Sequence, residues 1–221
     1  MWARSWKRFP ARRPSEPKPS AGRVALKVLP HDFVVDKERL RLFYRESEAT
    51  AALDHLNVVR AYDENNDGAT HYLVMEYVDG KTLDEIAKQP GGIAPRQAAE
   101  YVRQTADGLA HAHGCGLVHR DIKPSNLMVD LQGRVKILDM GLAHWAKRGG
   151  SPLDPSHAMV GTPYYISPEQ AINSQTVDAR SDIYSLGCTF YMLLTGRVPY
   201  DGNSLAEILL KHQNEQAPPV V

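Results

Sequence analysis

The segment HRDIKPSNL, residues 119–127, decides how this sequence is interpreted. It places a carboxylate (Asp121), an ammonium group (Lys123) and a carboxamide (Asn126) in one short loop. Phosphoryl transfer needs such a set, because a carboxylate can take a hydroxyl proton, a cation can stabilise the moving phosphoryl group and a neutral oxygen can help to bind Mg²⁺. Further along, Asp139 begins the tripeptide DMG, and its carboxylate suits Mg²⁺, which prefers oxygen ligands.

Composition narrows the classes of protein that the chain can represent. Lys and Arg together number 26, as do Asp and Glu, so no overall field predicts a nucleic-acid partner. The most apolar run, residues 183–194, is too short for a membrane span and predicts a buried helix. The two cysteines, Cys115 and Cys188, do not form a disulfide framework, which favours a reducing, cytoplasmic location.

Hydrophobic patterning predicts an α+β fold with two lobes. Strands dominate the first third, helices dominate the rest, and the junction near residues 78–80 is a preferred place for a ligand. Residues 141–168 show no periodicity, and a loop of that length inside a compact domain is usually functional. We expect strands at residues 24–29, 71–78, 127–129 and 135–138, and helices at residues 36–53, 95–113, 178–195 and from a capping box at Ser204 onward.

Five motifs together resemble eukaryotic-type protein kinases, and their wording is most like that of bacterial serine/threonine kinases. HRDIKPSN resembles the catalytic loop of that family, and DMG resembles its metal-binding DFG motif. GTPYYISPEQ (residues 161–170) resembles the P+1 loop and APE motif, SDIYSLG (181–187) resembles the start of the central helix, and VALK (24–27) resembles the strand with the ATP-binding lysine. The resemblance extends from Gly22 to about Pro219.

The resemblance implies a role for each residue of the catalytic loop. Asp121 would be the catalytic base, Lys123 would stabilise the γ-phosphoryl group, and Asn126 with Asp139 would hold Mg²⁺. It also implies that His119 packs the loop and that Asp182 braces it by accepting backbone hydrogen bonds. The implied cofactors are ATP and Mg²⁺.

The resemblance likewise implies a nucleotide site. Lys27 would contact the α- and β-phosphates and pair with a helix glutamate, either Glu46 or Glu48. Glu46 is preferred because it precedes His55 by the distance found in the family. The other implied contacts are Met75 as the gatekeeper, Glu76, Tyr77 and Val78 as the hinge, and Ala25 and Met128 on the two sides of the adenine ring.

Regulation is expected in the long loop. Arg120 would face a phosphorylated residue there, since an arginine binds phosphate through a fork of two hydrogen bonds. Ser156 is our preferred phosphorylation site and Ser151 the second candidate, while the alternative is that both are ordinary solvated serines. The hydroxyl of Thr162 is expected to bond Asp121 and Lys123 instead.

The chain departs from the family at both ends. No G-x-G-x-x-G loop precedes VALK, where the family has one to cover the phosphates. We therefore expect a disordered basic, proline-rich tail at residues 1–20, a partial N-lobe without the glycine-rich loop at 21–79, and a C-lobe without its last helices at 80–221.

The predicted function is that of a protein kinase acting on Ser and Thr of protein substrates. The resemblance also allows a dimer that phosphorylates itself. The alternative is a non-catalytic module that binds a nucleotide or a partner, because the missing glycine-rich loop argues against full activity. A small-molecule phosphotransferase is a weaker third interpretation, since such enzymes lack GTPYY-SPE.

Overall fold

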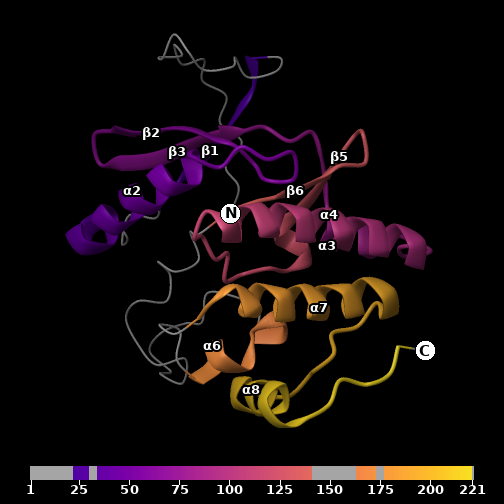
Figure 1. The fold of residues 1–221 in the computed structure, drawn as a ribbon. Helices are drawn as coiled ribbons and strands as arrows, with labels where there is room; N and C mark the ends of the chain where they lie inside the picture. Colours follow the sequence, from indigo (N-terminus) through magenta and orange to yellow (C-terminus); the bar gives the residue numbers. More distant parts are fainter. Residues whose placement is uncertain (1–21, 30–33, 141–162, 173–176, 221) are drawn as a thin grey trace.

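A computed structural model describes residues 22–29, 34–140, 163–172 and 177–220, apart from the side chains at positions 39, 42 and 46. The small lobe is a three-stranded antiparallel sheet in the order β1-β3-β2, with β1 at Val24–Val28, β2 at Ala61–Asp67 and β3 at Thr70–Glu76. Helix α2, Lys37–Ala51, packs beside this sheet at the top of Figure 1.

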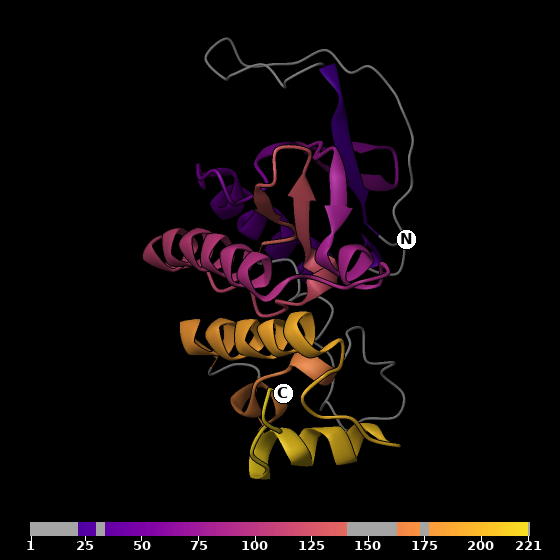
Figure 2. The ribbon, with the colours of Figure 1, turned by 90° about the vertical axis from the view of Figure 1, so that its right-hand side faces the viewer.

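The large lobe begins with a second antiparallel sheet, in the order β4-β5-β6, and is otherwise helical. Helix α7 lies between α4 and α8 in both Figure 1 and Figure 2. No helix of the described residues combines the length and apolar character needed to cross a membrane. The elements are β4 (Gly80–Thr82), α3 (Leu83–Ala87), α4 (Pro95–Gly114), η2 (Pro124–Asn126), β5 (Leu127–Asp130), β6 (Val135–Ile137), η3 (Pro163–Tyr165), α6 (Pro168–Ile172), α7 (Ala179–Thr195) and α8 (Leu205–Asn214).

The strongly patterned elements form where the sequence predicts them. Helix α4 starts at Pro95, a residue preorganised for the first helical turn, and buries Ala98, Thr105 and Leu109. Helix α7 is capped by the Asp178 side chain and ends at Gly196, whose φ of 71° is readily accessible to glycine. The apolar run 183–194 therefore lies in a helix of the core, as expected.

The capping box predicted for the last helix forms only in part. The Ser204 hydroxyl accepts from the backbone N of Glu207, which caps α8. The Glu207 carboxylate accepts from the backbone N of Asn203 instead of that of Ser204. The helix start is thus correct, and the reciprocal half of the cap is displaced by one residue.

Two elements escaped the sequence analysis. Strand β2 has the polar sequence AYDENND, which by propensity favours a turn, and it is a strand because β3 supplies its hydrogen-bond partners. Helix α3 is short, but Thr82 and Glu85 form a complete capping box at its start. That T-x-x-E pattern was a readable signal.

Two glycines allow close approaches that hold the large lobe together. A Cβ atom at Gly80 in β4 would lie 1.9 Å from the carbonyl oxygen of Val129. A Cβ atom at Gly108 in α4 would lie 2.8 Å from Ile137 Cδ1 and 3.1 Å from the Asn57 carbonyl oxygen. Helix α4 can therefore pack directly on β6 and on the loop that follows α2.

Candidate active site

The turn after α4 brings the three polar residues of the HRDIKPSN segment together. The Lys123 Nζ atom lies 2.7 Å from Asp121 Oδ2, and the Asn126 Nδ2 group donates to the same oxygen at 2.9 Å. Asn126 can reach back because the 3₁₀ turn η2 reverses the chain, and its Nδ2 also donates to the Asp121 carbonyl at 2.8 Å. Both side-chain bonds go to Oδ2, so Oδ1 is the oxygen positioned to accept a proton.

His119 has the structural role that the sequence predicts for it. Its ring is fully buried, its Nδ1 accepts from the backbone N of Asp121, and its Nε2 lies 2.8 Å from the Leu138 carbonyl. Because Nδ1 accepts, Nε2 carries the proton and donates. The ring thereby ties the loop of Asp121 to the residue that precedes Asp139.

Asp182 braces the same loop from α7, as expected. Its buried carboxylate accepts from the backbone N of His119 at 2.8 Å and of Arg120 at 2.7 Å. His113 Nε2, at the end of α4, lies 2.7 Å from the same carboxylate, a contact that the sequence analysis missed. Burial alone would raise the pKa of Asp182, but the bonds from His113 and the two amides hold this pKa below its ordinary value.

Lys27 and Asp139 meet across the two lobes. The Lys27 Nζ atom, on β1, lies 2.8 Å from Asp139 Oδ2. Asp139 has a φ of 58°, a left-handed conformation that aspartate tolerates better than most residues. Its Oδ1 atom is buried and has no hydrogen-bond partner within the described part of the chain. A buried carboxylate oxygen that protein groups leave unpaired fits a cation ligand.

Helix α2 contacts the DMG segment directly. Thr50 Oγ1 donates to the Met140 carbonyl at 3.3 Å, and the Met140 side chain is buried in the core of the large lobe. Of the predicted apolar face of α2, Phe43, Ser47 and Thr50 are buried. The Glu46 side chain, our preferred partner for Lys27, lies outside the described residues.

The residues predicted to surround the adenine ring gather in one apolar cluster. Met75 and Val78 are buried, and Ala25 and Met128 pack against the same group as partly buried neighbours. Ala25 on β1 lies opposite Met75 on β3 in the antiparallel register. Strand pairing thus joins residues that are far apart in the sequence.

The hinge residue Glu76 is held by a lysine that sequence reasoning missed. Lys136 Nζ lies 2.8 Å from Glu76 Oε1, and the lysine is buried. Lys136 stands between the buried Val135 and Ile137 on β6, so it points to the other face of the strand. An alternation broken by a lysine was the available signal. Next in the hinge, the Tyr77 ring lies under the Arg23 guanidinium, 4.6 Å from its centroid.

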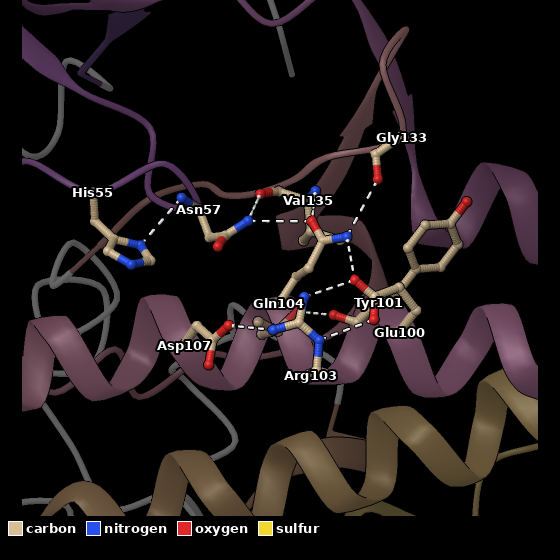
Figure 3. A network of polar contacts seen from close by, with 10 residues as sticks. His55, Asn57, Glu100, Tyr101, Arg103, Gln104, Asp107, Gly133 and Val135 are labelled. Atoms are coloured by element: carbon tan, nitrogen blue, oxygen red, sulfur yellow. Dashed lines mark hydrogen bonds and ion pairs between the residues drawn. The ribbon is translucent and has the colours of Figure 1, made fainter.

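The loop after α2 is fastened to α4 through the side-chain amide of Gln104 (Figure 3). Gln104 Oε1 accepts from the backbone N of Val135 at 2.8 Å and from Asn57 Nδ2 at 3.2 Å. Its Nε2 donates to Glu100 Oε1 at 3.0 Å. Asn57 Nδ2 also donates to the Val135 carbonyl at 2.8 Å, so this network connects α2, α4 and β6.

Arg120 occupies a constrained position beside Asp121. Its φ is 67°, and its Nε atom is buried without a partner among the residues that the structure describes. Ser151, Ser156 and Thr162, the residues named with it for regulation, lie outside the described residues. Within the described ranges no group of three or more His, Cys, Asp or Glu residues could hold a metal.

Comparison with known proteins gives the family. The protein kinase domain family matches residues 17–218, and the chain therefore belongs to this family. The chain is 40% identical over 195 residues to the serine/threonine-protein kinase PrkC of Bacillus subtilis, covering 88% of this chain and 30% of that protein. It is 42% identical over 200 residues to PknB of Mycolicibacterium smegmatis, covering 89% and 32%.

The solved structures agree on the fold. The kinase domain of Mycobacterium tuberculosis PknI matches with a TM-score of 0.66 and 28% identity, over 89% of this chain and 68% of that one. The chain is thus homologous to bacterial serine/threonine protein kinases and has their bilobal α+β fold. It spans about a third of the length of the curated relatives that it matches.

Proposed function

We propose that this chain transfers the γ-phosphoryl group of ATP to Ser and Thr hydroxyls of protein substrates. The observation that carries the proposal is the hydrogen-bonded group of Asp121, Lys123 and Asn126, with bonds of 2.7–2.9 Å inside one loop. The ion pair of Lys27 with Asp139 lends support, because these are the residue types that contact phosphates and metal in this family.

Each residue of the loop has a distinct task. Asp121 Oδ1 orients the substrate hydroxyl and takes its proton, while Oδ2 stays bonded to Lys123 and Asn126. Lys123 supplies positive charge to the oxygens of the phosphoryl group during transfer. Asn126 and Asp139 would hold Mg²⁺, and the unpaired Oδ1 of Asp139 supports its part in this. When bound, Mg²⁺ neutralises charge on the phosphate oxygens of ATP.

The nucleotide would be bound between the apolar cluster and the hinge. Ala25 and Met128 would contact the two faces of the adenine ring, with Met75 as the gatekeeper. Backbone groups of residues 76–78 would recognise the ring edge, and the Glu76–Lys136 ion pair holds this segment in place. Lys27 would contact the phosphates and, on its release from Asp139, pair with Glu46.

Regulation would act through Arg120. Its buried Nε atom has no partner among the described residues, which supports an anionic partner such as a phosphate on Ser156. Thr162 would bond Asp121 and Lys123. A second copy of the chain would be one protein substrate, through transient dimerisation. Both cysteines are free thiols, which supports a reducing, ATP-containing compartment, the cytoplasm.

The test is phosphotransfer by the purified chain from radiolabelled Mg-ATP to a Ser/Thr peptide library. The substitution Asp121→Asn should lower the rate by roughly 10²–10⁴, because it removes the proton acceptor while keeping the shape. Asp67→Asn, the same chemical change at an exposed position of β2, should leave the rate unchanged. Equal rates for Asp121→Asn and wild type would contradict the proposal. ATP binding without any transfer would favour the non-catalytic alternative.

A further inference from the structure

The peptide group just before Asp121 is held in an unfavourable backbone conformation. Arg120 has a φ of 67°, and a residue with a side chain in this region is strained by roughly 1–2 kcal/mol. Such a conformation persists only when neighbouring groups fix it. The Arg120 N–H is fixed by Asp182 Oδ1 at 2.7 Å, which leaves the carbonyl of the same residue to be accounted for.

The Arg120 carbonyl is fixed by a residue from a distant part of the chain. Gln170 Nε2, on α6, donates to the Arg120 carbonyl oxygen at 2.9 Å. The Gln170 side chain is buried, with only 4% of its surface exposed. A buried amide that makes such a bond contributes about 1 kcal/mol, and a carbonyl left without it costs about 1–3 kcal/mol.

The orientation of the Gln170 amide is set by its neighbours. Its Oε1 accepts from the backbone N of Ser167 at 3.2 Å and lies 3.1 Å from the Ser167 hydroxyl. The Ser167 hydroxyl is in turn 3.0 Å from that of Ser181, which donates to the Glu169 carboxylate. Because donors surround Oε1, the NH₂ group must face Arg120. Ser167 and Ser181 are fully buried, so this arrangement is shielded from water.

Fixing the Arg120 carbonyl also fixes Asp121. The carbonyl and the N–H of Asp121 belong to one planar peptide group, so rotation of the carbonyl would carry the start of Asp121 with it. That N–H donates to the His119 ring at 3.1 Å and would lose this bond on rotation. The Asp121 carboxylate would then shift relative to Lys123, and displacement of a catalytic group by about 1 Å can cost on the order of 10² in rate.

We infer that Gln170 is a positioning residue for phosphoryl transfer, which holds Asp121 in place by binding the Arg120 carbonyl from the segment that follows the P+1 loop. This inference rests on the proposed kinase activity. It adds a second brace to the one that Asp182 provides, on the opposite side of the Arg120 residue. It also gives a physical route by which the order of residues 163–172 affects the catalytic loop.

The experiment compares two substitutions with a matched control. Gln170→Met keeps the length of the side chain and removes both polar atoms, and Gln170→Glu keeps the acceptor for Ser167 but removes the donor to Arg120. Gln89→Glu makes the same chemical change at an exposed position after α3. For each chain, kcat and KM for ATP and for a peptide are measured together with the melting temperature.

We expect kcat to fall tenfold to a hundredfold in both Gln170 variants, while KM for ATP stays within twofold of wild type. The decrease should be at least as large in Gln170→Glu, where a carboxylate oxygen would face the carbonyl. Gln89→Glu should match wild type. A purely structural role would lower the melting temperature and leave kcat per nucleotide-binding site unchanged, and that result would overturn the inference.

A second measurement does not depend on activity. Hydrogen exchange of the amides at residues 119–121, which bind Asp182 and His119, should accelerate at least tenfold in Gln170→Met and stay unchanged in Gln89→Glu. Unchanged exchange in Gln170→Met would overturn the inference even if kcat fell. If the wild-type chain transfers no phosphate, the proposed function fails, and exchange alone decides whether Gln170 holds the loop.

Discussion

Lowering the pH should destabilise this chain through one buried histidine. His212 on α8 has 3% of its surface exposed and packs edge-on against Tyr200, with ring centroids 4.7 Å apart. Its Nδ1 lies 2.8 Å from the Tyr184 hydroxyl. Burial lowers the pKa of His212 from 6.5 to about 4 and outweighs the opposing effect of the Pro163 backbone.

The size and sign of the effect follow from this pKa. The unfolded chain binds a proton at His212 near pH 6.5, whereas the folded chain binds it only near pH 4, so stability is complete above 6.5 and is lost as the pH falls. One pKa unit corresponds to about 1.4 kcal/mol, so His212 alone should remove about 2 kcal/mol between pH 7.5 and pH 4.5.

The assay is urea unfolding of wild type, His212→Phe and His212→Gln at pH 7.5 and 4.5. Both variants will be less stable at pH 7.5, because Tyr184 changes or loses its partner. The decisive quantity is the change with pH, which should be about 2 kcal/mol smaller in both variants than in wild type. An equal loss of stability with pH in all three chains would refute the reasoning.

Three further substitutions test other contacts. Gly108→Ala should destabilise the fold by about 1–3 kcal/mol in thermal unfolding because its Cβ would clash with Ile137, whereas Gly187→Ala in α7, with nothing within 4 Å, should stabilise it by up to about 1 kcal/mol; equal shifts would contradict the packing argument. Gln104→Met should cost about 1–3 kcal/mol, measured by urea unfolding, since it strands the Val135 N–H; no change would show that water replaces the amide. Asp139→Asn should make ATP binding, followed by calorimetry, insensitive to EDTA, and a retained Mg²⁺ dependence would remove Asp139 from the metal site.

Helix ends and the catalytic loop could be predicted from the sequence because their signals are local. Pro95 and Gly196 mark helix boundaries through their own backbone preferences. HRDIKPSN folds into a turn whose members are within five positions of each other, so Asp121 and Asn126 meet without help from distant elements. The alternation in VKI placed β6 for the same reason.

Other features depended on partners far along the chain and carry no local signature. Strand β2 has a turn-like sequence and extends only because β3 lies beside it. Lys136 gains its role from Glu76, 60 positions away, and Gln170 from Arg120, 50 positions away.

The sequence by itself determined the family, the catalytic loop and the main helices, since these depend on residue types at short, fixed spacings. Only the tertiary structure decided how the loop is braced. The left-handed Arg120 is held between Asp182 and Gln170, and Asp139 faces Lys27 from the other lobe. A hydrogen bond between distant residues requires both partners to be buried at one point, and only packing of the whole chain brings them there.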